Sequence, residues 1–410
     1  MNSKKQRKMT LSTAKVSCVL SVTLLMGCAS TGPSQYESLQ LTKVEQQDIK
    51  SQPAYLQVNY NKLYQEGRRN EVLNRVEIGT KAFARGDIDI ARTNFDLALA
   101  QIETVYANNE SAHKARSLWY EEGQKDFKGE PYERAMAYYY RGLIYLAEGE
   151  FGNARASFLS ALMQDAFAED EQNSSDFASM LFLAGWSAQQ MGNVQLAQQA
   201  YDEYKMLRPE SPVPQASDNV LVIAETGKSP RKLADGLGHY ELVFRRGKNF
   251  NDVFASYNQQ LLTPLSDVYW QATSRGGRPV DAIVEGKARF KQFNEEMGDT
   301  LADLGVATRV WSPALGGDTA QISNILTLAG VAQMAIGANA KPRADTRYWS
   351  NLPDKIHGHT FGVQNPSELG RLEFVSKNDQ GAKVTTKGQQ QHVYESSNDS
   401  YFIWYSAHER

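Results

Sequence analysis

Four consecutive residues have types and a position suited to binding chemistry: Arg275, Gly276, Gly277 and Arg278. They precede Pro279, which favours the first turn of a helix, and an apolar stripe continues from there to Gly305. Free backbone amides at a helix N-terminus, together with two guanidinium groups, can hold a carboxylate or a phosphate. The alternative is a glycine turn whose arginines pair with local acids such as Asp281. The stretch is therefore a candidate anion-binding site, with a purely structural role as the other interpretation.

The other residues that could do chemistry form no recognisable constellation. His357 and His359 would share one face of a strand, but a metal site needs further ligands, so we interpret them as structural or surface histidines. The stretch from Gly227 to Pro230 contains Gly-Lys-Ser, yet a phosphate loop needs another glycine where Val222 stands. Neither a His-Glu-x-x-His motif nor a Gly-x-Ser-x-Gly motif occurs. The sequence therefore predicts a protein without metal, cofactor or enzymatic activity.

Cys28 ends a segment with the features of a bacterial targeting signal. Residues 1–27 carry five basic residues and no acidic one, and include the apolar run Val16–Met26. That run is shorter than the roughly 20 apolar residues that span a bilayer. Leu25-Met26-Gly27-Cys28 resembles the lipobox of bacterial lipoproteins, which implies cleavage before Cys28 and attachment of lipid to its thiol. The next two residues, Ala and Ser, are not the aspartate-type signal for the inner membrane, which implies an outer-membrane anchor facing the periplasm.

The mature chain is mildly acidic and has no free thiol. Cleavage removes five of the 44 basic residues and none of the 47 acidic ones, so the formal charge becomes −8. A chain of that charge is, as a whole, a poor partner for nucleic acid. Cys18 leaves with the signal and Cys28 carries lipid, so neither a disulfide nor thiol catalysis is expected. Residues 28–50 are mostly polar and predict a tether between the lipid and the folded body.

An internal repeat decides the interpretation of residues 51–210. After Gly79, a second glycine follows at +7, an alanine at +12 and an aromatic residue at +16, and the same offsets recur after Gly142 and Gly185. The expected packing residues are Gly79, Ala91, Phe95, Gly142, Ala154, Phe158, Gly185, Ala197 and Tyr201. These offsets resemble the tetratricopeptide repeat. The resemblance implies antiparallel helix pairs stacked into a helical repeat domain.

The residue types suit such packing. Glycine and alanine let two helices approach closely, and the aromatic residue fills the groove beside them. The glycines at +7, which are Gly86, Gly149 and Gly192, would stand in turns, where a positive φ costs glycine least. The starting glycines are 63 and 43 residues apart, whereas the family unit has about 34 residues. Insertions near residues 108–131 and 165–175 therefore interrupt the stack, and they serve either to bind partners or as spacers.

Five tyrosines gather on the second repeat: Tyr132, Tyr138, Tyr139, Tyr140 and Tyr145. Three of them are consecutive and must point in three directions around a helix, so we expect most to pack between helices. The alternative is an aromatic cradle for a peptide or a glycan, to which one tyrosine on the concave face would belong.

Residues 211–410 have the pattern of an α+β domain with a small antiparallel sheet. Strand-like stretches are Val220–Ala224, Leu242–Phe244, Ile356–Val363, Arg371–Ser376, Ala382–Thr386 and Tyr401–Tyr405. Helices are expected at Phe250–Leu262, Pro279–Gly305 and Ile322–Ala340. The predicted fold is therefore mainly α, with repeat helices first and an α+β domain second.

Several stretches carry a wider resemblance, which covers most of residues 70–360: Pro131–Arg134, Tyr139–Leu146, Arg275–Asp281 and Ala344–Trp349. The chain resembles a family of repeat-bearing outer-membrane lipoproteins from Gram-negative bacteria. That resemblance implies a role in envelope assembly, beside small lipoproteins tied to the activation of peptidoglycan synthases. It implies no catalytic residue.

The leading hypothesis for function is a membrane-tethered periplasmic adaptor. It would bind another cell-envelope protein in the groove of its repeats, because repeat arrays present extended concave surfaces. The family resemblance implies a partner related to peptidoglycan synthesis. The alternative is a module that binds peptidoglycan or another glycan through residues 211–410. Recovery of the protein on purified sacculi, compared with recovery of proteins from a membrane extract, separates the two.

Replacement of Cys28 tests the anchor. Cys28→Ser should leave an unprocessed precursor without lipid, because no other thiol stands at the cleavage boundary. Stable anchoring needs more than one acyl chain, which a triacylated Cys28 would supply. Fractionation of cells followed by mass spectrometry of the N-terminus measures both effects. A variant that still fractionates as a mature outer-membrane protein would contradict the lipobox.

Overall fold

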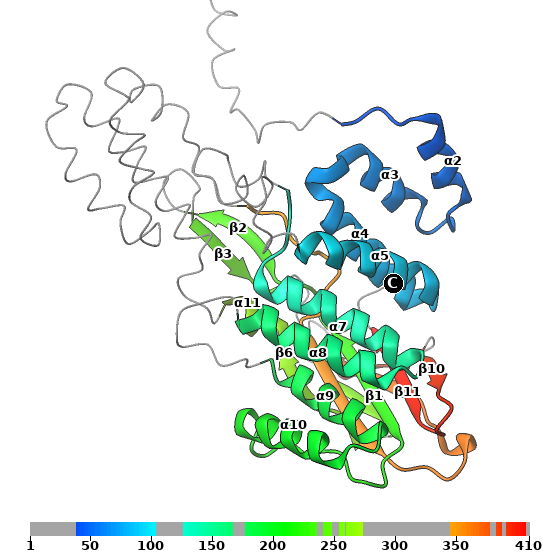
Figure 1. The fold of residues 1–410 in the computed structure, drawn as a ribbon. Helices are drawn as coiled ribbons and strands as arrows, with labels where there is room; N and C mark the ends of the chain where they lie inside the picture. The colour runs from blue at the N-terminus through cyan, green and yellow to red at the C-terminus, as the bar shows by residue number, and fades with distance from the viewer. Residues whose placement is uncertain are drawn as a thin grey trace, which may run out of the picture. The chain divides into compact units, whose positions relative to one another are not determined.

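The computed structural model describes residues 38–103, 126–166, 177–235, 241–247, 254–258, 260–273, 345–377, 383–387 and 391–406. These residues form a mixed α+β fold with substantial helical content (Figure 1). The chain from Leu41 onward belongs to one compact unit. The signal segment, Cys28, the Arg275–Arg278 turn and the helices expected at Pro279–Gly305 and Ile322–Ala340 lie outside the described residues.

The first half of the described chain is a succession of helices. It begins with α2 (Lys43–Ser51), α3 (Gln57–Glu66) and the short 3-10 helix η1 (Gly67–Asn70). Three antiparallel hairpins follow: α4 (Glu71–Arg85) with α5 (Ile88–Glu103), α7 (Pro131–Ala147) with α8 (Phe151–Ala166), and α9 (Ala178–Gln190) with α10 (Val194–Leu207). Helix α2 lies within the segment expected as a tether. Thr42 and Glu45 form a capping box there, so the last residues of the expected tether, from Lys43 onward, are helical.

Each hairpin brings together the glycine and the aromatic residue that the repeat pattern singled out. A Cβ atom added to Gly79 would lie 2.7 Å from Cε2 of Phe95. Phe158 covers Gly142 in the second hairpin and Tyr201 covers Gly185 in the third in the same way. In each hairpin the aromatic ring fills the space that the missing glycine side chain leaves. The alanines at +12 are buried beside these pairs: Ala91, Ala154 and Ala197.

The turns of the three hairpins depend on glycine. Gly86, Gly149 and Gly192 have φ values of 80°, 73° and 74°, a region where other residues clash with their own Cβ. The structure thus confirms the expected role of these glycines. Most of the clustered tyrosines pack as expected too, since Tyr132, Tyr139 and Tyr140 are buried.

The second half contributes three sheets. The strands are β1 (Val220–Thr226), β2 (Arg231–Asp235), β3 (Glu241–Arg245), β4 (Phe254–Tyr257), β5 (Gln260–Leu261), β6 (Thr263–Asp267), β7 (Lys355–Phe361), β8 (Leu372–Lys377), β9 (Lys383–Lys387), β10 (His392–Glu395) and β11 (Tyr401–Ser406). Helix α11 (Val268–Thr273) and η4 (Pro366–Glu368) join them. The sheet orders are β10-β11-β1-β7-β6, β5-β4-β8-β9 and β2-β3. The largest sheet is mixed rather than antiparallel as expected, because β1 and β11 run parallel.

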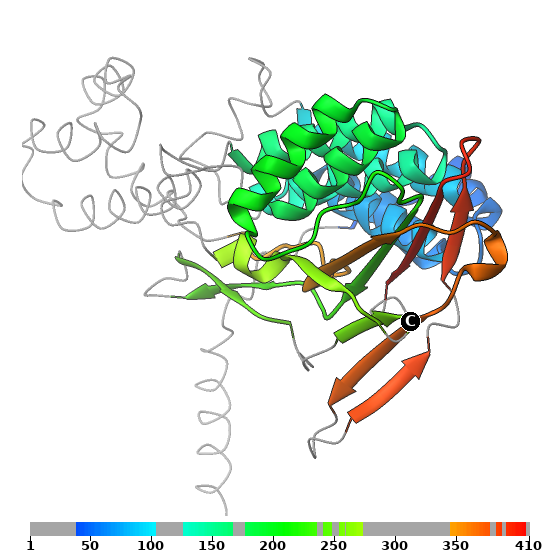
Figure 2. The same cartoon turned by 90° about the horizontal axis from the view of Figure 1, so that it is seen from below.

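Strand β1 is buried on both faces of the five-stranded sheet. Leu221 and Ile223 belong to the core shared with the helices. The residues on the other face of β1 belong to a second core, between the five-stranded and the four-stranded sheet: Val220, Val222 and Ala224. The five-stranded sheet therefore lies between a layer of helices and a second sheet (Figure 2). A strand covered on both sides reads as a continuous apolar run, which explains the Val-Leu-Val-Ile-Ala sequence. The change near residue 211 is thus a change from helices to strands within a shared core.

The first helix of each hairpin faces the five-stranded sheet. On α4, the ring of Phe83 lies 4.4 Å from that of Trp404 on β11. On α7, the hydroxyl of Tyr140 donates to Glu225 on β1 at 2.8 Å. On α9, the Ser179 amide donates to the Ser266 hydroxyl on β6 at 2.9 Å. The sheet therefore covers the inner face of the helices, which a repeat array would otherwise offer as its groove.

Glu225 is a fully buried carboxyl group where α7 meets strand β1, a contact that we call the joint between helices and sheet. One oxygen accepts from Tyr140, and the other accepts from the indole nitrogen of Trp404 at 3.2 Å. Burial raises the pKa of Glu225 from its ordinary value of 4.5 to about 7, and the hydrogen bonds oppose that rise. The folded protein therefore holds this proton more tightly than the unfolded chain does.

The helix expected at Phe250–Leu262 is wrong. The described residues of that segment form β4 and β5, which pair as a tight hairpin. Asn258 has a φ of 49° between the two strands, and asparagine tolerates this left-handed conformation better than most residues. Ala255 and Tyr257 are buried beneath the five-stranded sheet, so burial in the second core prevails over local helix propensity.

Substitution of Gly142 tests the helix packing. Gly142→Ala places a Cβ 2.7 Å from Cζ of Phe158, so the variant should lose about 1–3 kcal/mol of unfolding free energy through overpacking. The control is Gly152→Ala at an exposed position of α8, where the atom nearest to the added Cβ is Sδ of Met191 at 3.6 Å. That variant should gain about 0.5–1 kcal/mol from helix propensity. Urea titration measures both, and equal stabilities would contradict the packing.

The pH dependence of stability tests the buried acid. Because the folded pKa of Glu225 lies above the ordinary value, its contribution is fully favourable below pH 4.5 and is lost as the pH rises through about 7. Glu225→Gln keeps a hydrogen-bond acceptor without the charge. The unfolding free energy of this variant should therefore exceed that of the wild type by about 3 kcal/mol at pH 8 and by little at pH 4. Urea titrations at both pH values measure this, with exposed Glu210→Gln as control. Equal differences at the two pH values would count against a buried charge.

Candidate functional site

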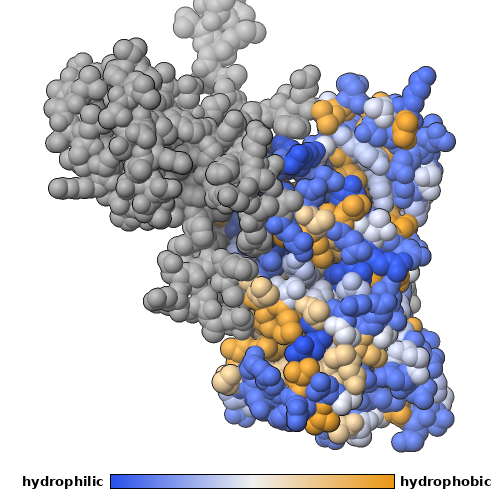
Figure 3. All heavy atoms as spheres, in the orientation of Figure 1, coloured by the Kyte–Doolittle hydropathy of each residue, from blue (hydrophilic) through white to orange (hydrophobic). Residues whose placement is uncertain are grey.

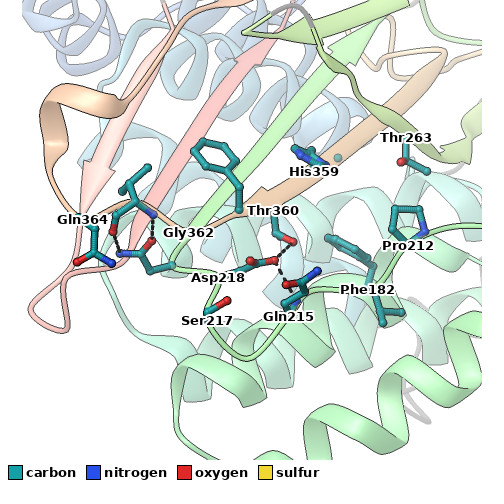
Figure 4. Close-up of a pocket in the computed structure, with 15 residues that line it drawn as sticks. Phe182, Pro212, Gln215, Ser217, Asp218, Thr263, His359, Thr360, Gly362 and Gln364 are labelled. Atoms are coloured by element: carbon teal, nitrogen blue, oxygen red, sulfur yellow. Dashed lines mark hydrogen bonds between the residues drawn. The ribbon is translucent and has the colours of Figure 1, made fainter.

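A pocket of about 690 Å³ opens beside the end of β7, between helix α9, the connection from α10 to β1, and the start of β6 (Figure 4). Its volume lies within the range of about 300–1,000 Å³ that small-ligand pockets occupy. The residues that line it are Phe182, Pro212, Val213, Gln215, Ser217, Asp218, Asn219, Thr263, Gly358, His359, Thr360, Phe361, Gly362, Val363 and Gln364.

The pocket exists because β6 is shorter than β7. The two strands pair from Asp267 with Lys355 to Thr263 with Gly358, and there the pairing ends. One residue earlier, the amide of Leu262 donates to the carbonyl of Ala255 at 2.9 Å, so the chain has already crossed to the four-stranded sheet. In the described part of the chain, the end of β7 beyond Gly358 pairs with β1 alone. Its other edge faces the pocket.

The connection from α10 to β1 forms a braced wall of this pocket. Asp218 Oδ2 accepts from the Thr360 hydroxyl at 2.7 Å and from the Gln215 amide at 2.9 Å. The side chain of Asn219 pairs with the backbone of Val363, accepting from its N–H at 2.8 Å and donating to its carbonyl at 3.2 Å. Figure 4 draws these bonds as dashed lines. Asp218 Oδ1 accepts no hydrogen bond from any described residue.

The two histidines of β7 differ in their surroundings although they share one face of the strand. His357 is buried, and its Nε2 lies 3.0 Å from the hydroxyl of Thr226; burial lowers its pKa to about 4. His359 is half-buried at the pocket and stacks on Phe361 with ring centroids 6.0 Å apart. Burial lowers the pKa of His359, and the charge of Asp218 opposes this. Its neutral ring can donate one hydrogen bond and accept another.

The electrostatic character of the pocket is mildly acidic. Asp218 is the one charged side chain among the described residues that line it. Within the described ranges, no three histidine, cysteine, aspartate or glutamate side chains cluster as metal ligands would. The lining therefore offers hydrogen-bond donors and acceptors, two phenyl rings and one carboxylate, which together suit a neutral or basic ligand.

The residues predicted from the sequence lie elsewhere. The repeat residues pair between helices and are buried, while Cys28 and the Arg275–Arg278 turn lie outside the described residues. The sequence analysis missed Asp218, Asn219 and Thr360. Asp218 and Thr360 are 142 residues apart in the chain, and no local motif connects them. The one local signal is a polar stretch directly before a buried strand.

Two of the stretches behind the family resemblance, Pro131–Arg134 and the described part of Ala344–Trp349, meet in a structural cluster, whereas Arg275–Asp281 lies outside the described residues. Glu133 caps the N-terminus of α7. Its carboxylate accepts hydrogen bonds from the backbone amide of Trp349 at 2.8 Å and from the ammonium group of buried Lys232 at 2.6 Å. Arg347 donates to the side chain of Asn70 at 2.7 Å. These contacts tie Pro131–Arg134 to the segment before β7, so their residue types are explained by packing.

The outer helix of the third hairpin is a second exposed feature. Val194 and Met206 on α10 are each 75% exposed, beside a shallow hollow of about 580 Å³. On the face in Figure 3, hydrophobic residues gather in the lower half, where α8, α9 and α10 lie.

Comparison with known proteins finds no match for this chain among protein-family models, curated proteins or solved structures. Of the helices in the described ranges, none is both long enough and apolar enough to traverse a bilayer.

Proposed function

We propose that this protein is a non-catalytic scaffold of the bacterial envelope, anchored by lipid at Cys28 to the outer membrane and facing the periplasm. It holds a segment of another envelope protein in the pocket beside β7. The observation that carries this proposal is the open edge of β7 inside a pocket of about 690 Å³. A wall braced by hydrogen bonds and an edge of β7 that no described strand pairs with beyond Gly358 suit the binding of an extended segment.

The helices fit a tetratricopeptide-like array whose inner face packs against the sheet of the same chain and not against a partner. The glycine–aromatic pairs of the three hairpins support this assignment, since each recurs at the same offset. The face such an array would present to a partner is covered by the chain's own sheet. The partner therefore binds at the edge of the sheet and not in the groove of the repeats.

The anchor sets where the pocket can act. The 15 residues from Cys28 to Thr42 reach at most about 50 Å when fully extended. The folded body therefore stays close to the inner surface of the outer membrane. A partner there would be a cell-envelope protein, and the resemblance found in the sequence suggests one connected with peptidoglycan synthesis.

Photo-crosslinking in cells tests this function. With p-benzoyl-phenylalanine at Gln364 or Gln215 in the pocket, both positions should give an adduct with the same envelope protein. The same label at exposed Gln198 on α10 is the matched control and should give none. Mass spectrometry identifies the adducts. Adducts from Gln198 alone, or adducts of carbohydrate instead of protein, would overturn the proposal.

A further inference from the structure

We infer that the open edge of β7 binds its partner as an added β-strand, an extended peptide that carries a basic residue. The inference rests on the proposed function and specifies the partner. The peptide would continue the line of β6 and pair with β7 from His359 onward. This mode uses backbone hydrogen bonds for affinity and alternate side chains for specificity.

The backbone supplies the first argument. From His359 to Phe361, β7 pairs with β1 on one side, whereas β6 reaches only Gly358 on the other. Proteins usually block such an edge with lysine, proline or a covering loop. Here the edge opens into a pocket instead, and none of the described lining residues from Gly358 to Gln364 is lysine or proline. The unpaired edge from His359 to the end of β7 at Phe361 is about 10 Å long at 3.4 Å per residue, which suits a short added strand.

The side chains supply the second argument. Successive residues of an added strand point to opposite faces of the sheet. On the helix side they would meet Thr360 and the free Oδ1 atom of Asp218. On the other side they would meet His359 and Phe361, whose ring lies 5.3 Å from that of Tyr257. The favoured peptide therefore has a lysine or arginine that points to the helix side of the sheet. One or three positions away it has an apolar residue that points to the opposite side.

Charge excludes the opposite class of peptide. No lysine or arginine is found among the described residues that line the pocket, and Asp218 is the one charged group. An acidic side chain placed there would face a carboxylate without a counter-charge. A charge-assisted hydrogen bond from lysine or arginine to Asp218 would instead add to the affinity.

The test uses the detergent-solubilised lipoprotein and a positional-scanning library of N-acetylated octapeptides. Pools with lysine or arginine fixed should bind about tenfold more tightly than pools with aspartate or glutamate fixed. The best single peptide is then N-methylated at each position in turn. Methylation at alternate positions should weaken binding about tenfold, because those amides donate to β7, and the positions between them should tolerate it.

Asp218→Asn should abolish the preference for basic pools, and exposed Asp202→Asn on α10 is its control. Melting temperatures show whether each variant folds, and the N-methyl scan needs no variant at all. Uniform effects of methylation, absence of binding by every pool, or tighter binding of tetra-N-acetylchitotetraose would overturn strand addition. If crosslinks from Gln364 persist in that case, the scaffold function stands; if they too are absent, both proposals fail.

Discussion

The buried carboxyl group of Glu225 is the interaction on which the arrangement of this protein depends. It lies on the central strand β1 and accepts hydrogen bonds from Tyr140 on the middle hairpin and from Trp404 on the neighbouring strand β11. A carboxyl group without these donors would be costly to bury. The two bonds join α7 and β11 to the central strand β1, which runs parallel to β11. Aromatic packing around Phe83 and Tyr140 surrounds the same point.

This joint changes where function can reside. Helical arrays commonly bind partners along their inner face, but here α4, α7 and α9 each contact a strand of the same chain. What remains open is the edge of that sheet, where β6 stops short of the end of β7. The helices thus act as a frame for the sheet, and we propose the edge of that sheet as the binding position.

The sequence predicted those features that depend on short spacings. The pairs of Gly79 with Phe95 and of Gly142 with Phe158 follow from one offset within a hairpin, and the apolar run of β1 marks a buried strand. Features made by distant residues could not be predicted. The parallel pairing of Val220 with Tyr401 and the bond between Asp218 and Thr360 join residues far apart in the chain. The local sequence predicts a helix for the segment that includes Ala255 and Tyr257, whereas the burial that makes it a strand depends on a sheet contributed largely by later residues.

Native-state hydrogen exchange tests most directly whether the helices and the sheet form a single cooperative body. The amides of β1 and of α7 should exchange with the same free energy of opening, equal to that of global unfolding, and respond equally to urea. That result would show that the sheet occupies the inner face of the helices as an integral part of the fold. The contrary result would be exchange of the β1 amides with a lower free energy of opening than that of the α7 amides. It would mean that the sheet detaches from the helices, and it would contradict this account.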